Sequence, residues 1–511
     1  MPTGWVHSFR FVTPYCRSDD RAKPSGFLAI IGNMWHRLFL FLSLLAFVGQ
    51  GWAYRLPDLG AVATDAFSTQ EEEAIGRMVM VQIREREPNY LDDPELEDYL
   101  AAIGRRLTEA SDQPFRRYRF FVLRDNTINA FAMPGGYIGV HSGLILTAES
   151  ESELAAVLAH EMGHVIHRHI AQLIDQQKTS NMVMLGSMLV AILAARTGGS
   201  QVAEAAAVGG QAFAVQQQLG FSRAFEHDAD RTGLDILAKA GFDPSAAPRF
   251  FGRLLRESRL YENNAPVYMR THPLTTDRIS DLENRISSPT FKYSLRPRLD
   301  SLGFSAARAK LMAMNGTPSE AVARAFDGSA TGIDRQMARV RAALRANDVK
   351  RARAAFDQYA KGWPDEHWRD LLEAEVLTAE GRLPDAMAKL ERAMQRAPEA
   401  VAPRLYAIDV ALRLGQVERA ELLAREAVDR DREERRYWQA LGKVAAAKGD
   451  EAWVHRAQGE SFVLDDRLEA AIDQFEQARR ARRGDYFWEA ELDAKIRMLK
   501  DEVRQRKRLT R

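Results

Sequence analysis

A period of 34 residues runs through the second half of this 511-residue chain and strongly constrains its fold. Turn-forming residues stand at this interval at Asn347, Gly381, Gly415 and Gly449. A unit this short can bury its apolar face only against a neighbouring unit. The period therefore predicts stacked helix pairs over residues 333–490, rather than a helical bundle with chance spacing. Small or apolar residues recur five, nine and twelve positions after the first three turns, at Ala352, Phe356, Tyr359, Ala386, Leu390, Ala393, Ala420, Ala424 and Ala427.

This period and its small residues at helix contacts resemble tetratricopeptide repeats. The resemblance implies an all-α superhelix whose concave surface binds a protein partner or client. The register breaks after Gly449 and restarts at Asp466, half a period later. The tail, residues 491–511, is rich in Lys and Arg. We expect a solvated helix end there, with membrane or nucleic-acid contact as a weaker alternative.

The charge and cysteine content exclude several classes of protein. The chain has 71 Lys and Arg against 70 Asp and Glu, a formal net charge of +1. A surface built to hold nucleic acid is strongly basic, so we do not expect nucleic acid as a partner. Cys16 is the one cysteine in the sequence, which excludes a disulfide framework and a cysteine-rich zinc finger.

The N-terminal region has the pattern of a secretory signal peptide. Residues 38–48 are apolar, follow the basic pair His36 and Arg37, and precede a small-residue site that ends at Ala53. We expect residues 1–53 to be a signal peptide with a mis-assigned extension, its true start being Met34. An uncut membrane anchor is the alternative.

Residues 54–295 mix helical and strand patterns, which predicts an α+β, mostly helical domain with a small sheet. Residues 296–332 then form a connector to the repeats. Two apolar runs within 182–215 are too short to span a bilayer. They form either a buried helix pair or a hairpin that touches a membrane surface or covers the active site. The expected helices are 71–84, 96–110, 151–177, 221–239, 244–258 and 277–287, and the expected strands are 118–124 and two within 129–140.

The motif His160-Glu161-Met162-Gly163-His164 lies within the helix expected over residues 151–177. Residues four apart on a helix share one face, so the two imidazoles can bind one zinc ion. Glu161 is turned about 100° from His160 and lies beside the metal, where a general base takes a proton from water. The motif predicts a zinc peptidase with an open metal position.

The third zinc ligand is expected in the segment from Ser222 to Asp230. Glu226 is the candidate, and Asp230, one helical turn later, accepts the free N–H of a ligand His and fixes its tautomer. His227 is the rival ligand, and it faces elsewhere if Glu226 points inward. The alternative for both acids is an ordinary charged surface.

The HEMGH motif followed by SRAFEHDAD resembles the gluzincin metallopeptidases of the HtpX and CAAX-prenyl-protease type. An exported chain that combines this domain with C-terminal repeats resembles the BepA-type periplasmic proteases, which assist outer-membrane β-barrel assembly. The resemblance implies one Zn²⁺ per chain, ligated by His160, His164 and Glu226, with Glu161 as the catalytic base. From its helical spacing, we also expect Asp230 to be part of the catalytic site. It also implies a location in the periplasm of a Gram-negative bacterium, soluble or peripherally attached to a membrane.

The same resemblance assigns a substrate-binding strand, which falls on residues 129–140. Backbone pairing there involves Asn129, Ala130 and Phe131, and we expect Gly135 and Gly136 to let a substrate backbone approach closely.

The loop after the zinc-binding helices matches the family at His272, a residue that can close the open zinc position. The alternative is a surface His before Pro273. Arg278 either stabilises the oxyanion or pairs with an acid. His167 and His169 continue the active-site helix away from the metal and are interpreted as structural.

The motif predicts a zinc metalloendopeptidase, and the resemblance implies that it is exported, self-restrained and degrades misfolded or stalled outer-membrane proteins in assembly and quality control. Its repeats are expected to bind these clients or the β-barrel assembly machinery. The first alternative is a chaperone or assembly adaptor whose protease site is largely latent. The second, a scaffold with a structural zinc, does not account for Glu161 beside the first His.

Overall fold

The computed structural model describes residues 68–114, 116–176, 222–258, 266–293, 299–328 and 331–509. The expected signal peptide and the apolar segment 182–215 lie outside these residues. Within the described part of the chain, no helix has the length and hydropathy needed to cross a bilayer. Residues 64–511 form one compact unit.

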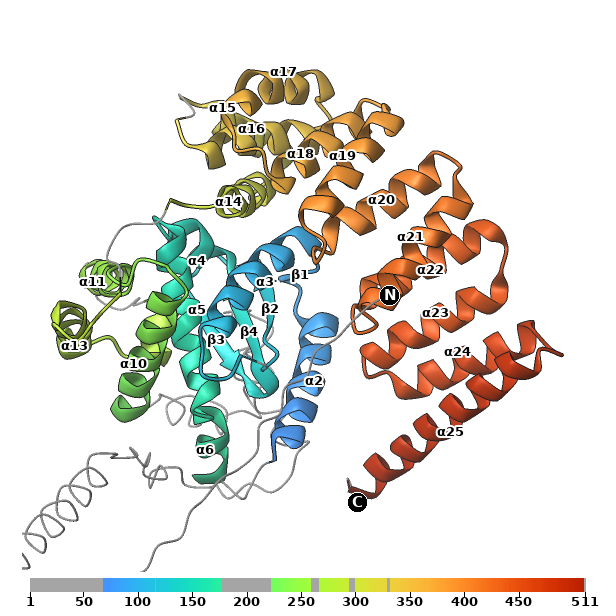
Figure 1. The fold of residues 1–511 in the computed structure, drawn as a ribbon, viewed down its shortest axis with the longest axis horizontal. Helices are drawn as coiled ribbons and strands as arrows, with labels where there is room; N and C mark the ends of the chain where they lie inside the picture. Colours follow the sequence, from blue (N-terminus) through green and yellow to red (C-terminus); the bar gives the residue numbers. More distant parts are fainter. Residues whose placement is uncertain are drawn as a thin grey trace, which may run out of the picture. The chain divides into compact units, whose positions relative to one another are not determined.

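A small sheet and the helices around it make up the first half of this unit (Figure 1). The strand order is β1-β2-β4-β3, with β2 and β4 parallel and the other neighbours antiparallel. The predicted α+β class, mostly helical with a small sheet, is confirmed. The elements are α2 (Thr69–Arg86), β1 (Tyr90–Leu91), α3 (Pro94–Glu109), β2 (Arg119–Leu123), β3 (Ala130–Met133) and β4 (Tyr137–His141).

The strand β3 lies at one edge of the sheet, so only one of its two sides pairs with another strand. The turn to β4 is a single 3₁₀ turn, Pro134–Gly136, with positive φ angles of 75° at Gly135 and 80° at Gly136. Left-handed backbone of this kind favours glycine. A Cβ at Gly135 would lie 2.9 Å from Glu73 Cα, and one at Gly136 would lie 2.6 Å from the Arg117 carbonyl oxygen. The chain's own backbone therefore approaches both glycines closely, and the approach of a substrate backbone there stays a prediction.

Further helices among the described residues complete this half, and the helix expected over residues 151–177 is divided in two. It ends at Ile166 because Arg168 adopts a left-handed conformation with φ of 55°, and a second helix starts at His169. The helices are α4 (Ser142–Thr147), α5 (Glu151–Ile166), α6 (His169–Gln176), α10 (Arg223–Lys239), α11 (Ala246–Ser258), α12 (Val267–Thr271) and α13 (Thr276–Ser287).

Helices α5 and α10 pack closely because glycines stand at their contact. A Cβ at Gly163 of α5 would lie 2.8 Å from the Ala229 carbonyl oxygen, and one at Gly233 of α10 would lie 3.0 Å from Ala159 backbone atoms. Both distances are shorter than ordinary van der Waals contact, so the helix axes come closer than larger residues would permit. Ser150 and Ser222 cap the two helices through bonds from Glu153 N and Phe225 N.

The second half is helical, and the residues with the 34-residue period mark its turns. Asn347, Gly381, Gly415 and Gly449 all have positive φ and each separates the two helices of a pair. Asp466, where the register restarts, has a φ of 57°. The helices are α14 (Leu302–Met314), α15 (Pro318–Phe326), α16 (Ile333–Arg345), α17 (Val349–Tyr359), α18 (His367–Ala379), α19 (Leu383–Arg396), α20 (Ala402–Arg413), α21 (Val417–Arg430), α22 (Arg435–Lys448), α23 (Glu451–Leu464), α24 (Leu468–Ala481) and α25 (Tyr486–Leu509).

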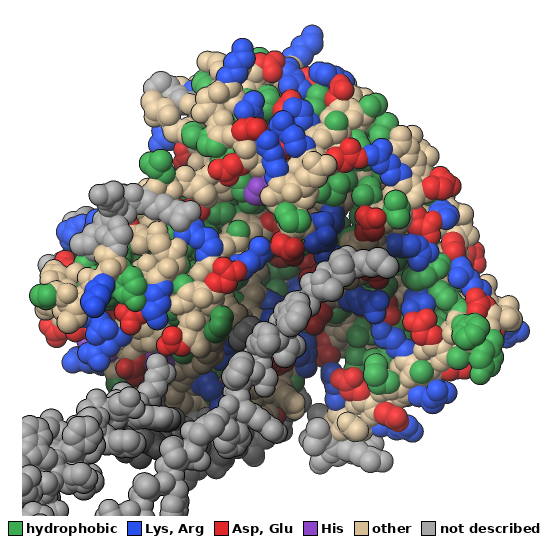
Figure 2. Space-filling model, viewed as in Figure 1, with side chains coloured by type: hydrophobic (Ala, Val, Ile, Leu, Met, Phe, Trp, Pro, Cys, Tyr) green, Lys and Arg blue, Asp and Glu red, His purple; other side chains and the backbone are tan. Residues whose placement is uncertain are grey.

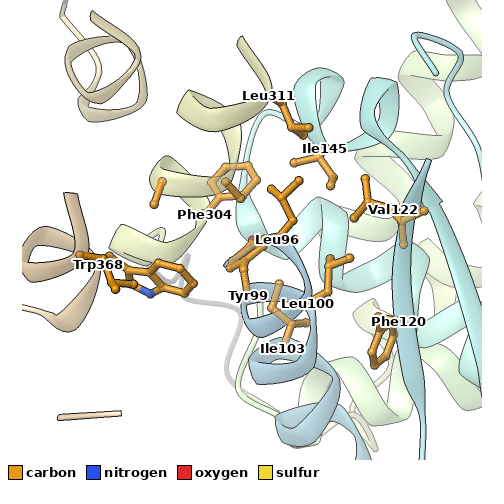
Figure 3. Close-up of a cluster of buried hydrophobic side chains, with 14 of the residues drawn as sticks. Leu96, Tyr99, Leu100, Ile103, Phe120, Val122, Ile145, Phe304, Leu311 and Trp368 are labelled. Atoms are coloured by element: carbon orange, nitrogen blue, oxygen red, sulfur yellow. The ribbon is translucent and has the colours of Figure 1, made fainter. Parts of the chain in front are cut away.

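One hydrophobic cluster continues from the sheet domain into the repeats (Figure 3). Tyr99 of α3 is buried between Phe304 of α14 and Trp368 of α18, with ring centroids 6.4 Å from each. Buried aromatic contacts of this type add to the free energy gained from area burial. The cluster joins α3 to the first repeat helices.

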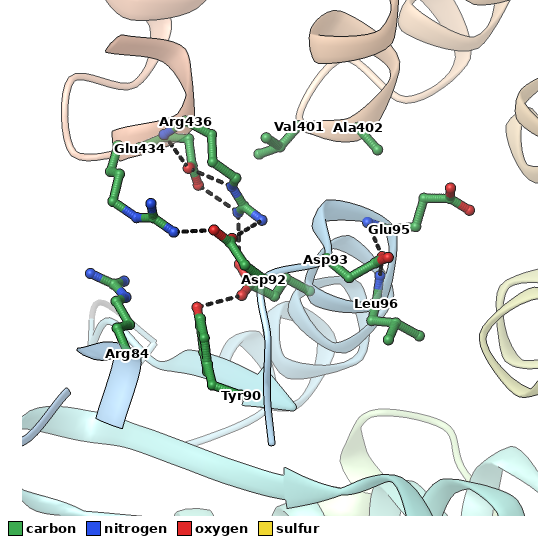
Figure 4. Close-up of polar contacts among 12 residues, drawn as sticks. Arg84, Tyr90, Asp92, Asp93, Glu95, Leu96, Val401, Ala402, Glu434 and Arg436 are labelled. Atoms are coloured by element: carbon green, nitrogen blue, oxygen red, sulfur yellow. Dashed lines mark hydrogen bonds and ion pairs between the residues drawn. The ribbon is translucent and has the colours of Figure 1, made fainter. Parts of the chain in front are cut away.

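Carboxylates at the start of α3 also join it to the repeats (Figure 4). Asp98 accepts hydrogen bonds from the Val401 and Ala402 amides at 2.9 and 2.8 Å, at the start of α20. Glu97 accepts one from Arg436 at 2.6 Å and one from the Tyr90 hydroxyl at 3.3 Å. Burial raises the pKa of Glu97 to about 7, an effect that the charge of Arg436 opposes.

This raised pKa predicts a pH dependence of stability. Because the folded state keeps a proton on Glu97 that the unfolded chain releases near pH 4.5, stability falls as the pH rises toward the folded pKa. We expect the free energy of unfolding to fall by about 1 kcal/mol between about pH 6 and pH 8 on account of this group. Glu97→Gln removes that share of the pH dependence, measured by urea unfolding. Glu418→Gln, at an exposed position of α21, is the control, and parallel profiles for Glu97→Gln and the natural chain would contradict the prediction.

Candidate active site

The structure brings His160, His164, Glu226 and His272 together in one buried cluster. The nearest ligand atoms of these four residues all lie within 4.8 Å of one another. His160 and His164 come from α5, Glu226 from the first turn of α10, and His272 from the end of α12. The close packing of α5 on α10 sets the distance between the imidazoles and the carboxylate.

The donor atoms have the spacing that a tetrahedral zinc ion requires. Its ligands, at about 2.0–2.1 Å from the metal, lie about 3.3 Å from one another. The His160 and His164 Nε2 atoms are 3.1 Å apart. The Glu226 oxygens lie 3.4 Å from His160 Nε2 and 3.6 Å from His164 Nε2. Two imidazoles and a carboxylate are also a donor set that zinc accepts.

The protonation states of His164 and Glu226 suit a cation at this place. Burial would lower the pKa of His160, but its hydrogen bonds to Asp230 and Glu226 raise it to about 9, so a metal ion would displace a proton from this imidazole. Burial lowers the pKa of His164 well below its ordinary value, so its imidazole is neutral and keeps a lone pair. Burial alone would raise the pKa of Glu226, but the charge of His272 and the hydrogen bonds from His160 and His272 hold it well below its ordinary value. Glu226 is therefore a carboxylate at neutral pH.

Each imidazole of α5 is held from behind by a second side chain. His160 Nδ1 lies 3.0 Å from the Asp230 carboxylate. His164 Nδ1 lies 2.9 Å from His169 Nδ1, whose ring stacks on Phe225. We interpreted His169 as structural on a continuous helix, but the break at Arg168 turns its ring onto His164. No sequence signal locates that break.

Arg278 pairs with two acids of the site. Its Nε lies 2.7 Å from Asp230 Oδ2, and its Nη1 lies 2.7 Å from Glu226 Oε2. Burial alone would raise the pKa of Asp230, but the hydrogen bond from Arg278 holds it below its ordinary value. Of the two roles left open for Arg278, the geometry therefore matches pairing with acids.

Glu161 is buried beside the cluster and contacts the edge strand. Its Oε2 accepts a hydrogen bond of 3.0 Å from the Ala132 amide, and its Oε1 lies 3.5 Å from His272 Nε2. Burial raises the pKa of Glu161, and the charges of His272 and His160 oppose this effect. A carboxyl group with a raised pKa is suited to proton transfer near neutral pH.

The remaining predicted residues lie at the sheet edge or away from the site. Ala130 and Phe131 are on β3, while Asn129 precedes it and is fully buried, its side chain near His141. His227 lies on α10 with its Nδ1 3.9 Å from Asp281, outside the cluster.

Tyr268, which sequence reasoning missed, stacks on His272 with ring centroids 4.7 Å apart. It precedes His272 by four residues, the spacing of contacts within a helix.

A buried set of two His, one Glu and an adjacent Glu on paired helices is the site of a metallopeptidase. Residues 94–286 match the model of peptidase family M48, and residues 377–444 match a tetratricopeptide repeat model. The chain therefore carries an M48 metallopeptidase domain, followed by tetratricopeptide repeats.

Relatives with known names are similar to this chain over part or most of its length. The chain is 29% identical over 454 residues to the beta-barrel assembly-enhancing protease of Escherichia coli K12, covering 87% of this chain and 91% of that protein. It is 36% identical over 333 residues to a Vibrio cholerae protein provisionally given the same name, covering 63% and 66% of the two chains. The metalloprotease LoiP of Escherichia coli is 31% identical over 185 residues, covering 34% of this chain and 64% of that protein.

Proposed function

We propose that this chain is an exported, zinc-dependent endopeptidase that acts in the assembly and quality control of outer-membrane β-barrel proteins. The observation that carries the proposal is the buried cluster of His160, His164 and Glu226 with Glu161 beside it. The named relatives support the role in β-barrel assembly, and the signal-peptide pattern supports the periplasm as its place of action.

Zinc is the metal that this donor set favours, and His160, His164 and Glu226 are its proposed ligands. When bound, zinc polarises a carbonyl and lowers the pKa of water to about 7. Glu161 is the proposed general base, which takes the proton of the attacking water and returns it to the leaving amine. Asp230 and His169 hold the ligand rings in orientation from their Nδ1 sides.

An extended substrate is proposed to pair with the open side of β3. The Asn129 carbonyl accepts a hydrogen bond from the His141 amide, so the backbone polar groups of Asn129 face β4. Along an antiparallel strand, successive residues direct these groups alternately toward the paired strand and away from it. Ala130 and Ala132 therefore face the open side, and the Ala132 amide reaches Glu161. A substrate backbone paired at Ala130 and Ala132 would run past the catalytic carboxylate.

Self-restraint is proposed to depend on the segment from Tyr268 to His272. The Tyr268 amide donates to the Ile128 carbonyl at 3.2 Å, on the same open side of the strand. His272 Nδ1 lies 3.0 Å from Glu226 and 3.4 Å from His160 Nε2. An imidazole at this position can take the coordination place that water needs, while its Nε2 contacts Glu161.

The substitution His272→Ala tests this restraint. If His272 keeps about nine molecules in ten closed, its removal raises the rate of casein cleavage by about tenfold. His455→Ala in α23, far along the repeats, should leave the rate unchanged. Zinc content is measured on both variants. Unchanged or lower cleavage by the His272→Ala protein with zinc still bound would rule out this restraint.

A second candidate function is that of a chaperone or assembly adaptor with a largely latent protease. The contact of His272 with both Glu226 and Glu161 favours it, because such a site is closed. Cells that carry only the Glu161→Gln chain separate the two functions. Normal outer-membrane protein levels in these cells would favour the adaptor, and accumulation of stalled barrel proteins would favour proteolysis.

A further inference from the structure

A cavity with a volume of about 790 Å³ lies between the helices of the repeats. Helices α14, α16, α18, α20 and α22 line it, together with Leu390 of α19. Figure 2 shows Lys and Arg side chains recessed in a hollow on the face that includes α20. A cavity of this size accommodates a short segment of a peptide.

One wall of the cavity already binds carboxylates of the same chain. Lys310 Nζ lies 2.7 Å from Asp93 and 2.8 Å from Glu95, and the Tyr406 hydroxyl donates to Glu95 at 2.7 Å. Both acids belong to the start of α3 or its cap. Arg341 also pairs with Glu95. The repeat surface is therefore built to receive acidic side chains.

Two further basic side chains of the cavity, Arg413 and Lys443, are accessible to a ligand. Both line the cavity and are exposed, and no carboxylate of the described residues pairs with either. The described lining residues include two acids, Asp409 and Glu375. Asp409 is exposed, whereas the Glu375 carboxylate pairs with Arg341 at 2.9 Å. Apolar side chains complete the lining between these charges, among them Leu344, Leu405 and Leu412.

We propose that this cavity binds a peptide segment of a protein partner in which Asp or Glu alternates with aliphatic residues. The carboxylates pair with Arg413 and Lys443, and the aliphatic side chains cover Leu405 and Leu412. The start of α3 likewise presents carboxylates, those of Asp93 and Glu95, to the cavity wall that contains Lys310. The inference rests on the proposed function, because it specifies what the repeats of an assembly protease recognise.

The test uses a peptide with the sequence of residues 91–102, LDDPELEDYLAA, labelled with fluorescein and amidated at its C-terminus. Its binding to the full-length Glu161→Gln chain is measured by fluorescence anisotropy, so no cleavage occurs and failure of the protease proposal does not affect the result. The double substitution R413E/K443E should weaken binding at least tenfold. A peptide with its five acids replaced by Asn and Gln should bind equally weakly.

The matched control is R483E/R497E, which makes the same charge change at exposed positions outside the cavity lining, in the turn before α25 and on α25 itself. It should change affinity less than twofold, and circular dichroism confirms that both double variants are folded. Equal binding by the neutral peptide, equal weakening by both double variants, or no binding of the acidic peptide at 1 mM would each overturn the proposal.

Discussion

The Glu161→Gln chain is expected to cleave casein at least about a hundredfold more slowly than the natural chain. The glutamine side chain would keep an oxygen that accepts from the Ala132 amide, which Glu161 now bonds at 3.0 Å. The helix, the ligands and the strand therefore stay in place, while the group that transfers the proton is lost. Initial rates of casein cleavage measure the change.

Glu149→Gln is the matched control, because it removes an exposed carboxylate just before the same helix. It should cleave casein at the natural rate. Both variants should keep the zinc content of the natural chain, since neither residue is a proposed ligand. A Glu161→Gln protein with zinc bound and near-natural cleavage would show that another group acts as the base.

Arg278→Met is expected to lower the free energy of unfolding by about 3–5 kcal/mol. The Arg278 guanidinium is buried and contacts Asp230 and Glu226 at 2.7 Å each. Its removal leaves two carboxylates in a buried site with one positive partner fewer. Methionine fills similar space, so the lost charge and not a cavity determines the result. Urea unfolding measures the change.

Arg270→Met serves as the control for this substitution, because Arg270 lies on the nearby helix α12 and is exposed. It should change the free energy of unfolding by less than about 0.5 kcal/mol. If the two variants unfold at the same urea concentration, the buried ion pairs of Arg278 contribute nothing to stability. Zinc added to the Arg278→Met protein should restore part of the loss, because zinc neutralises Glu226.

The parts of the site that follow from helical spacing could be predicted from the sequence. His160 and His164 share a helix face, and Asp230 lies one turn after Glu226, so these groups meet once α5 packs on α10. Contacts that depend on irregular backbone could not be predicted. His169 reaches His164 only because Arg168 has a positive φ.

In the fold, too, periodic features could be predicted from the sequence and contacts between distant residues could not. The 34-residue period predicted the turns within the helix pairs, because glycine at fixed intervals marks where one helix of a pair ends, and the structure shows that these turns are left-handed. The contacts of Glu95 and Glu97 with the repeats join residues far apart in the sequence and leave no periodic signal. The two strands within residues 129–140 were predicted, but the backbone that approaches Gly135 and Gly136 was visible only in the structure.

The zinc content of the purified chain tests the central claim most directly. Elemental analysis should find one zinc ion per chain in the natural protein and in the Glu161→Gln variant. It should find almost none in the His164→Ala and Glu226→Ala variants, whose folding is checked by circular dichroism. Zinc-free natural protein that still cleaves casein, or full zinc content in both ligand variants, would contradict the account.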